Sequence, residues 1–356
     1  MSTKKIFFHN INEDIQIYNF TKNSYKKIGE IGEGTFSKVF LVDKMAPQNE
    51  EDSNRFCLKV NKRYDFIEVV KASENKENSQ KHNINVNKAK ELSSVEMREL
   101  MILKKISNYN HPNIIKLIDV HFEKREIWIL MEYLPTDLEK FFALNSQNPQ
   151  VMNEHFFKTI AYQCIKGLCF LHKLQIMHRD IKPSNIFYDD KKNIVKIGDF
   201  GLSRALSYDV KAKYTIAGTY AYNPPEVLLG SLEYTNVVDV WSLGCVLAEI
   251  CTNKNLFGKS TQLGVLKLIY QIFGSFNQNI LPGYDKFPNS NLIMNLPEKN
   301  GIGLINYIKA NKKFEFENEN FYDLIEKMLC IDPTKRISAK DCLSHPWFSN
   351  VDKLRN

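Results

Sequence analysis

Four polar side chains in the middle of the chain could together carry out chemistry on a phosphate group. Asp180, Lys182 and Asn185 lie within one six-residue stretch, and Asp199 follows fourteen residues later. Phosphoryl transfer needs metal ligands, a cation on the moving phosphate and an acceptor for the hydroxyl proton. Asn185 and Asp199 offer the hard oxygen ligands that Mg²⁺ prefers. Lys182 offers the cation, and Asp180 offers the carboxylate that orients and deprotonates the hydroxyl. Each residue alone is as typical of a turn or a helix cap, so the prediction rests on their occurrence together.

A glycine-rich stretch nearer the N-terminus could hold the phosphates of a nucleotide. It lies between strand-like segments, and its glycines allow backbone N–H groups to approach phosphate oxygens closely. Ser37 stands where a third glycine would be expected, and a short G-x-G sequence is also typical of a hairpin turn. The candidate nucleotide-binding residues here are Ile31, Gly32, Glu33, Gly34, Thr35, Phe36, Ser37, Lys38 and Val39.

Lys59 and Glu99 are a candidate ion pair beside this loop. In the short apolar run 56–60, period-two alternation places Lys59 on the face opposite to the large apolar side chains. Glu99 shares a helical face with Ile102 and Ile106, so its carboxylate must find a partner or stay neutral. A lysine on such a strand is also commonly an edge residue facing solvent. We expect the pair to hold the Lys59 ammonium group on nucleotide phosphates.

The elements that must position these residues divide the chain into a strand-rich first part and a helix-rich second part. Strand-like segments follow from Tyr25, whereas a capping box at Ser93 predicts a helix to about Ile106. After Asn153 the pattern is predominantly helical, with apolar residues at the spacing of one broad helical face. Residues 71–90 contain five lysines, two glutamates, five asparagines and almost no large apolar residue, which predicts a disordered insertion. We therefore expect two lobes with a cleft between them.

The composition argues against several other classes of protein. The 48 Lys and Arg residues against 41 Asp and Glu give a net charge of +7, which suits phosphate ligands but is weak support for nucleic-acid binding. The seven cysteines include no C-x-x-C pair, so reduced thiols are expected rather than a zinc site or disulfides. No apolar stretch approaches the roughly 20 residues of a membrane helix, and the first apolar run is too short for a signal peptide. We expect a protein of the cytosol or nucleus that binds neither membranes nor nucleic acids.

From about Tyr25 to Phe348 the chain resembles the eukaryotic protein kinase family. The resemblance implies an α+β, bilobal kinase-like fold with a small β-rich N-lobe and a larger α-helical C-lobe. It also implies ATP and Mg²⁺ as cofactors and protein substrates. The motifs that carry it are His178-Arg179-Asp180-Ile181-Lys182-Pro183-Ser184-Asn185, Asp199-Phe200-Gly201, Pro224-Pro225-Glu226, Asp239-Val240-Trp241-Ser242-Leu243-Gly244 and Asp332-Pro333-Thr334-Lys335-Arg336. The implied boundaries are an N-terminal extension at 1–24, a kinase domain at 25–348 with its N-lobe at about 25–134 and its C-lobe at about 135–348, and a C-terminal tail at 349–356.

The same resemblance implies roles at the nucleotide end of the site. Met131 would lie behind the adenine, and the backbone from Glu132 to Leu134 would form the hinge that hydrogen-bonds it. Asp137 could reach the ribose.

At the acceptor end, Lys182 stands two residues after Asp180, which is the pattern of serine/threonine kinases. By resemblance, Thr219 would help to form the floor beneath the acceptor hydroxyl. Arg336 would pair with Glu226.

Several stretches are similar to the cyclin-dependent kinases. Residues 93–99 look like a degenerate form of the helix that contacts the cyclin, and residues 268–310 look like the insert of the cyclin-dependent and mitogen-activated kinase group. Asn223 departs from the pattern, because those kinases usually carry an arginine there that helps to fix a preference for proline after the target. Thr215 is the candidate activation site, and its phosphate would pair with Arg179. An unmodified loop threonine is the alternative.

The expected function is therefore a diverged, cyclin-dependent-like serine/threonine kinase. It would act as a cell-cycle regulator or as an activator of other such kinases, with a cyclin-like subunit or as a monomer. The runner-up is a kinase-shaped scaffold that acts through partner binding, but such proteins generally lose the equivalents of Lys59, Asp180 or Asp199, and this chain has kept all three. A nucleic-acid-binding protein would gain support only if binding survived physiological salt.

Overall fold

The computed structural model divides the chain into two compact units. The first consists of Met1–Lys90 with Leu117–Tyr133, and the second of Glu91–Lys116 with Leu134–Asn356. Residues 91–116, which the predicted N-lobe includes, thus belong to the second unit. The structure describes residues 16–33, 37–45, 55–62, 86–123, 126–148, 151–206, 217–314 and 318–349.

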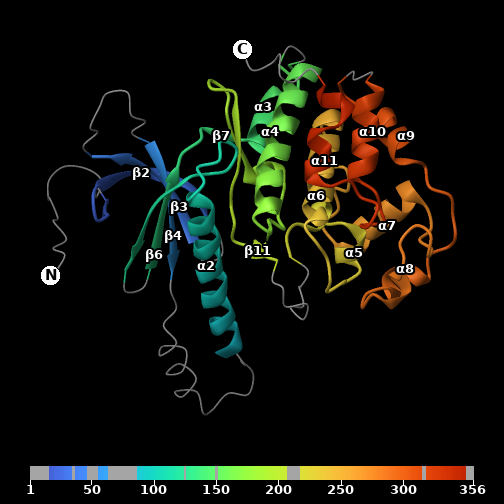
Figure 1. Cartoon of the computed structure of the whole chain (residues 1–356), viewed down its shortest axis with the longest axis horizontal. Coiled ribbons are helices and arrows are strands. Elements are labelled where there is room, and N and C mark those ends of the chain that lie inside the picture. The colour runs from blue at the N-terminus through green and yellow to red at the C-terminus, as the bar shows by residue number, and fades with distance from the viewer. Residues whose placement is uncertain are drawn as a thin grey trace. The chain divides into compact units, whose positions relative to one another are not determined.

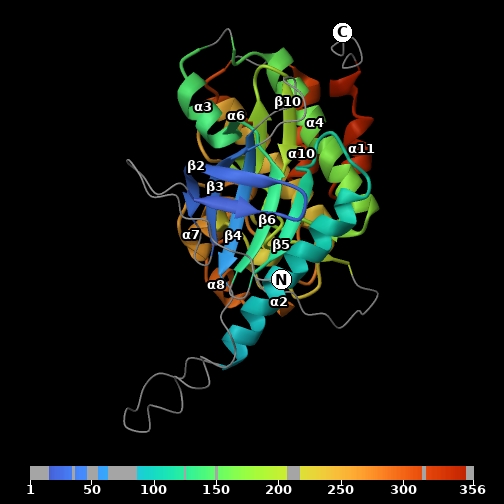
Figure 2. The same ribbon diagram turned by 90° about the vertical axis from the view of Figure 1, so that its left-hand side faces the viewer.

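The first unit is built on an antiparallel sheet of six strands in the order β1-β2-β3-β4-β6-β5. Figure 1 shows these strands in blue to teal, and Figure 2 shows the sheet after a 90° turn, with β2 to β6 labelled. The strands are β1 (Ile17–Asn19), β2 (Ser24–Glu33), β3 (Ser37–Lys44), β4 (Arg55–Lys62), β5 (Leu117–Phe122) and β6 (Glu126–Glu132).

The core of the first unit lies on one face of this sheet. In β4 the side chains of Leu58 and Val60 are buried in the core, whereas Lys59 between them is only half-buried. This is the alternation predicted for a strand with one buried face. Tyr18 and Phe20 join the same core. The stretch before Tyr25 therefore contributes a strand and two core residues, which its irregular pattern did not indicate.

Helix α2 (Val86–Ser107) begins earlier than the sequence pattern predicts. The capping box at Ser93 was expected to open the helix, and residues 71–90 were expected to be disordered, but residues 86–90 are helical. Both expectations are wrong on this point. The run from Lys88 to Leu92 consists of strong helix formers, and its helix propensity outweighs the low apolar content of the stretch. Residues 71–85 lie outside the described part of the chain.

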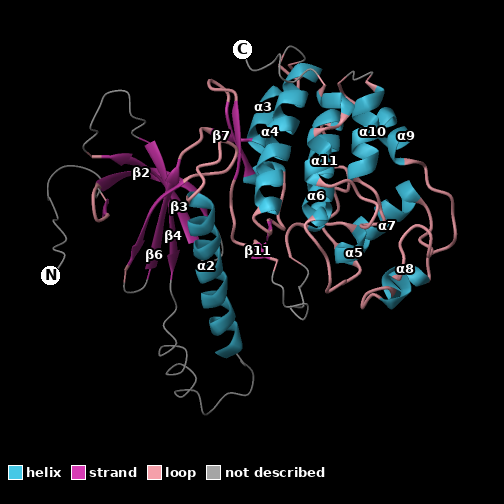
Figure 3. Ribbon diagram, viewed as in Figure 1, coloured by secondary structure: helices cyan, strands magenta, loops and turns pink. Residues whose placement is uncertain are grey.

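The second unit is mainly helical, as Figure 3 shows. Its short strands form two small sheets, with the orders β10-β9-β7 and β11-β8. The strands are β7 (Thr136–Asp137), β8 (Ile176–Met177), β9 (Ile186–Asp189), β10 (Ile194–Ile197) and β11 (Arg204–Ala205). The helices besides α2 are α3 (Leu138–Asn145), α4 (Glu154–Lys173), α5 (Pro225–Leu228), α6 (Val237–Thr252), α7 (Gln262–Phe273), α8 (Asn291–Met294), α9 (Leu304–Asn311), α10 (Glu319–Met328) and α11 (Ala339–Leu343), with 3₁₀ turns η1 (Pro183–Asn185), η2 (Tyr220–Tyr222), η3 (Tyr284–Lys286) and η4 (Pro346–Phe348).

Two long helices, α4 and α6, pack together in the core of this unit. The Asn153 side chain caps α4 by accepting a hydrogen bond from the backbone N–H of Phe156 at 3.0 Å. The predicted apolar face of α4 is buried. Helix α6 is buried along almost its whole length, as expected of a helix that is apolar on all sides. The predicted α+β class, with a β-rich first part and a helical second part, is confirmed.

Among the described residues, no helix is both long enough and apolar enough to cross a bilayer. The seven cysteines carry free thiols.

Candidate active site

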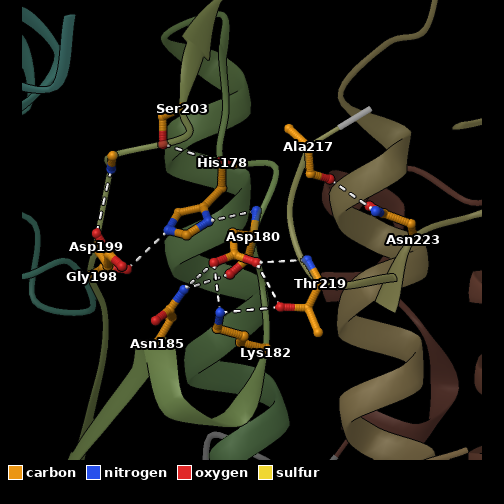
Figure 4. Close-up of polar contacts among 11 residues, drawn as sticks. His178, Asp180, Lys182, Asn185, Gly198, Asp199, Ser203, Ala217, Thr219 and Asn223 are labelled. Carbon is orange, nitrogen blue, oxygen red and sulfur yellow. Dashed lines mark hydrogen bonds and ion pairs between the residues drawn. The ribbon is translucent and has the colours of Figure 1, made fainter. Parts of the chain in front are cut away.

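The carboxylate of Asp180 lies at the centre of a cluster of polar side chains, drawn in Figure 4. Lys182 Nζ lies 2.9 Å from Asp180 Oδ2. Asn185 Nδ2 donates to the same oxygen at 2.9 Å and to the Asp180 backbone oxygen at 2.8 Å. Thr219 donates to Asp180 Oδ1 from its backbone N–H at 3.2 Å and from its hydroxyl at 3.3 Å. Lys182 Nζ also donates to the Thr219 hydroxyl at 3.2 Å. Four residues predicted from the sequence are thus brought together.

The backbone that carries Asp180 is held from beneath by Asp239 in α6. Its two carboxylate oxygens accept hydrogen bonds from the backbone N–H groups of His178 and Arg179, each at 2.8 Å. His172 Nε2 lies 3.1 Å from the same carboxylate. Burial alone would raise the pKa of Asp239, but the hydrogen bond and charge of His172 and the groups of the loop hold the pKa below its ordinary value. Arg179 has a φ of 70°, a conformation that needs such support in a residue other than glycine.

His178 joins this loop to the segment that carries Asp199. His178 Nδ1 accepts from the backbone N–H of Asp180 at 3.3 Å, so Nε2 is the nitrogen that donates to the backbone oxygen of Gly198, at 3.0 Å. The backbone N–H of Gly198 donates in turn to the backbone oxygen of Asn185 at 3.0 Å. The two predicted metal ligands, Asn185 and Asp199, are therefore tied together through main-chain contacts.

The donor groups of Asn185 and Asp199 fit a magnesium ion. Asn185 uses Nδ2 on two oxygens of Asp180, which leaves Oδ1 for a cation. The carboxylate of Asp199 is turned by a positive φ of 61° and accepts from the backbone N–H of Gly201 at 3.5 Å. No group of three or more His, Cys, Asp or Glu side chains in the described chain could hold a metal. Two protein oxygens suit Mg²⁺, which usually keeps waters and phosphate oxygens as its other ligands.

The predicted phosphate-binding loop lies on the hairpin of β2 and β3 in the first unit. Gly32 pairs with Val39, and Glu33 pairs with Lys38. Lys38 Nζ forms ion pairs with Glu30 at 3.2 Å and with Glu33 at 3.7 Å, at the surface of the hairpin. Ile31 is 43% exposed, and Ser37 opens β3. Gly34, Thr35 and Phe36 lie outside the described residues.

Lys59 lies in β4 directly opposite Val39 of the hairpin. The first unit therefore brings the predicted lysine next to the predicted loop. Glu99 lies on α2 and is 4% exposed. Its carboxylate is close to Gly201, two residues after Asp199: a Cβ built on this glycine would be 3.9 Å from Glu99 Oε2. Lys59 and Glu99 belong to different units, so the ion pair expected between them stays a prediction.

The residues predicted to form the hinge lie at the end of β6 and directly after it. Glu132 ends β6 opposite Phe56, and Met131 pairs with Cys57. Leu134 is buried. Asp137 is the N-cap of α3, where its Oδ1 accepts from the backbone N–H of Lys140 at 2.9 Å.

A comparison with known proteins identifies the family. Residues 25–348 match the family model described as the protein kinase domain. The chain belongs to the protein kinase family. It is 31% identical to cyclin-dependent kinase B2-1 of Oryza sativa subsp. japonica over 335 residues, which cover 92% of this chain and 91% of the relative. The predicted resemblance is confirmed, and the scaffold alternative gains no support.

The segment that carries Thr219 ends in a buried ion pair. Glu226 in α5 contacts Arg336 through two hydrogen bonds, at 2.8 Å to Nη1 and 3.1 Å to Nη2. This is the pair that the resemblance implied. Upstream of it, Asn223 Nδ2 donates to the backbone oxygen of Ala217 at 2.9 Å. Thr219 lies between these two residues in sequence and contacts Asp180; its role in an acceptor floor stays a prediction.

The predicted regulatory residues are described only in part. Thr215 lies outside the described residues. Arg179 is 6% exposed. Burial, and after it the charge of Arg179, lowers the pKa of Arg98 on α2 from its ordinary value.

Sequence reasoning missed the part that Asp239 takes in the kinase. Its motif was recognised, but its contacts with His178 and Arg179 were not predicted. A signal was present, since Asp239 is a carboxylate inside the otherwise apolar stretch that forms α6. A buried carboxylate must find donors, and here they are backbone N–H groups about 60 residues away in sequence.

Proposed function

We propose that this kinase transfers the γ-phosphate of Mg·ATP to serine and threonine hydroxyls of protein substrates. The observation that carries the proposal is the arrangement around Asp180. A carboxylate held by Lys182, Asn185 and Thr219 can orient a hydroxyl and accept its proton, and the same lysine would place a positive charge beside the phosphate to be moved.

In the proposed reaction the substrate hydroxyl oxygen forms a bond to the γ-phosphorus. The bond between that phosphorus and the bridging oxygen of ADP breaks, and ADP leaves with the bonding electron pair. The hydroxyl proton passes to Asp180 and from there to solvent. Lys182 Nζ, 2.9 Å from Asp180, offsets negative charge on the phosphoryl oxygens. Positioning and electrostatics account for most of the catalysis in this class of reaction.

The cofactor contacts proposed for this kinase use both units. Asn185 and Asp199 would hold Mg²⁺, which neutralises charge on the phosphates when it is bound. Lys59 and the hairpin of β2 and β3 would hold the phosphates, and the backbone of Glu132 and Leu134 would hold the adenine.

The decisive experiment replaces Asp180 by Asn, which keeps the size of the side chain but removes the proton acceptor. We expect kcat to fall by about 10²- to 10⁴-fold, the usual contribution of a general base, with unchanged thermal unfolding. Asp285→Asn, an exposed change on η3, is the matched control and should leave kcat within about twofold. Near-normal phosphorylation by the Asp180 variant would show that the assigned role is wrong.

The choice of substrate follows from the acceptor segment. Lys182 and Thr219 together match the serine/threonine pattern, so phosphate should appear on serine and threonine but not on tyrosine. Because Asn223 stands where related kinases carry arginine, we propose that proline after the target is not required. A peptide array with every residue at that position measures both properties, and a strict need for proline would contradict the second.

We propose that phosphorylation of Thr215 activates the kinase. The guanidinium group of Arg179 supports the proposal, because it suits bidentate contact with a phosphate, and its charge also acts on Arg98, whose pKa is lowered by burial and by this charge. Thr215→Ala should then give the same low activity with or without an activating kinase. Equal activation of the wild type and this variant would contradict the proposal.

We also propose a cyclin-like partner that binds α2. The rice relative is named as a kinase that depends on a cyclin. On α2 the side chains of Met97 and Met101, one helical turn apart, are 51% and 68% exposed. Met101→Glu should abolish co-purification of such a subunit, whereas Leu144→Glu on α3, at an 83% exposed position, should not. Full activity of the purified single chain would argue against an obligatory subunit.

A further inference from the structure

The side chain of Asn223 closes a small loop around Thr219. Its Nδ2 donates to the backbone oxygen of Ala217 at 2.9 Å, and the residue is 7% exposed. Between these residues the chain turns through η2, in which Tyr222 N–H donates to Thr219 O at 3.0 Å and Asn223 N–H donates to Tyr220 O at 3.1 Å. The amide therefore bridges the two ends of the turn that carries Thr219. A buried amide in this place is a specific contact rather than a solvated surface group.

The closed loop meets the catalytic loop at Gly218. Its φ is 80°, and a Cβ at this position would lie 2.5 Å from the backbone oxygen of Arg179 and 3.2 Å from Asp180 Oδ1. The two backbones thus approach as closely as a residue without a side chain allows.

That peptide group includes the carbonyl of Ala217, to which Asn223 is bonded. Fixing the carbonyl fixes the orientation of this peptide plane, and the next N–H group follows it after the single residue Gly218. This next N–H is that of Thr219, which reaches Asp180 Oδ1 at 3.2 Å together with the hydroxyl at 3.3 Å. The bond from Asn223 thus holds the chain two residues before Thr219, whose two hydrogen bonds go to Asp180 Oδ1, while Lys182 contacts Oδ2.

We infer that Asn223 is a positioning residue for the protein substrate side of the reaction. It holds Ala217, and thereby Thr219, in the place where Thr219 orients Asp180 and forms the acceptor floor. It contacts the backbone of this segment rather than the groups proposed to bind nucleotide, so its loss should affect peptide turnover and not ATP affinity. The inference rests on the proposed function, because it assigns a role within that reaction.

The test compares Asn223→Asp, Asn223→Ala and Asn311→Asp in the full-length chain. Asn223→Asp keeps the shape but places an acceptor oxygen against the Ala217 carbonyl, so kcat/KM for a serine peptide should fall about 10- to 100-fold. Asn223→Ala removes the contact without repulsion and should show a smaller loss of about 3- to 10-fold. The control, Asn311, makes the same kind of bond, from Nδ2 to Tyr307 O at 2.9 Å, on α9. Its Asp variant should stay within about twofold.

Two further measurements separate positioning from a general loss of structure. The Kd of ATP, measured by titration without peptide, should remain within about twofold of the wild type in both Asn223 variants. In a background of Thr219→Val, the Asn223→Asp change should reduce kcat/KM by much less than it does in the wild type, because residues that act through one another are not independent.

Three results would overturn the inference. They are native-like kcat/KM in both Asn223 variants, an equal loss in ATP affinity and peptide turnover, and full multiplicativity of the Thr219 and Asn223 changes. These outcomes are read against a wild-type kinase that phosphorylates the peptide. Absence of phosphorylation by the wild type, or full activity of the Asp180→Asn variant, would instead contradict the proposed function.

Discussion

The ion pair of Glu226 and Arg336 gives the sharpest prediction about stability. The Arg336 side chain is 0% exposed, and all five of its N–H hydrogens find acceptors. Two bonds go to Glu226, at 2.8 and 3.1 Å. The others go to the backbone oxygens of Cys330, Val237 and Ile331, at 3.0, 3.3 and 3.4 Å. The guanidinium group therefore joins α5, the start of α6 and the turn after α10.

Glu226→Ala would leave this buried cation without its carboxylate. Breaking one partner of a buried pair destabilises a protein by about 3 to 5 kcal/mol, because the remaining charge stays desolvated. That is a large part of a total stability of about 5 to 15 kcal/mol. Glu226→Gln retains an acceptor oxygen and the packing, so a smaller loss of about 1 to 3 kcal/mol is expected from the weaker hydrogen bonds.

Urea unfolding followed by tryptophan fluorescence measures these differences. The matched control is Glu319→Ala, which removes an ion pair with Lys309 of 3.0 Å between side chains that are 83% and 43% exposed. It should change stability by less than about 1 kcal/mol. In Glu226→Leu with Arg336→Met, no charge stays buried, and part of the stability should return. A loss below about 1 kcal/mol in Glu226→Ala, or a double variant less stable than Glu226→Ala, would refute the reasoning.

Three further predictions concern single residues. Gly218→Ala should lower kcat/KM for peptide by at least about tenfold in a steady-state assay, because its Cβ would lie 2.5 Å from the Arg179 backbone oxygen at a positive φ; unchanged kinetics would contradict the described contact. Burial raises the pKa of Glu249 to about 7 from 4.5, despite a 2.6 Å hydrogen bond from the Tyr222 hydroxyl. The folded state therefore holds the Glu249 proton more tightly than the unfolded state. Protonated Glu249 contributes about 3 kcal/mol to the free energy of unfolding below about pH 4.5, and this contribution is lost as the pH rises to about 7. Urea unfolding from pH 5 to 8 should show this slope in the wild type but not in Glu249→Gln, and parallel curves would argue against it. Asn153→Ala should reduce stability by about 1 kcal/mol through loss of the α4 cap without altering kcat, as paired unfolding and activity measurements would show.

Much of the site could be predicted from the sequence because its key residues are close along the chain. Asp180, Lys182 and Asn185 belong to one short loop, so their types and spacing already indicated their chemistry. The strand around Lys59 and the helix after Asn153 could be predicted for the same reason. Period-two and helical patterns report which side of a local element is buried, and both patterns agree with the burial found.

The start of α2 and the strand β1 could not be predicted in this way. Neither stretch has a clear apolar period, so helix propensity decided the first, and pairing with β2 decided the second. In both places the local pattern was a poor guide because the deciding interactions were of another kind.

The sequence by itself determined the chemical groups of this kinase and the local elements that carry them. Only the tertiary structure decided that the buried carboxylate of Asp239 holds the backbone of His178 and Arg179, and that the Asn223 side chain bonds to the backbone of Ala217. The physical reason is that burial obliges a polar group to find a partner but does not specify which one. The partner is set by the path of the chain, which brings distant backbone groups within hydrogen-bonding distance.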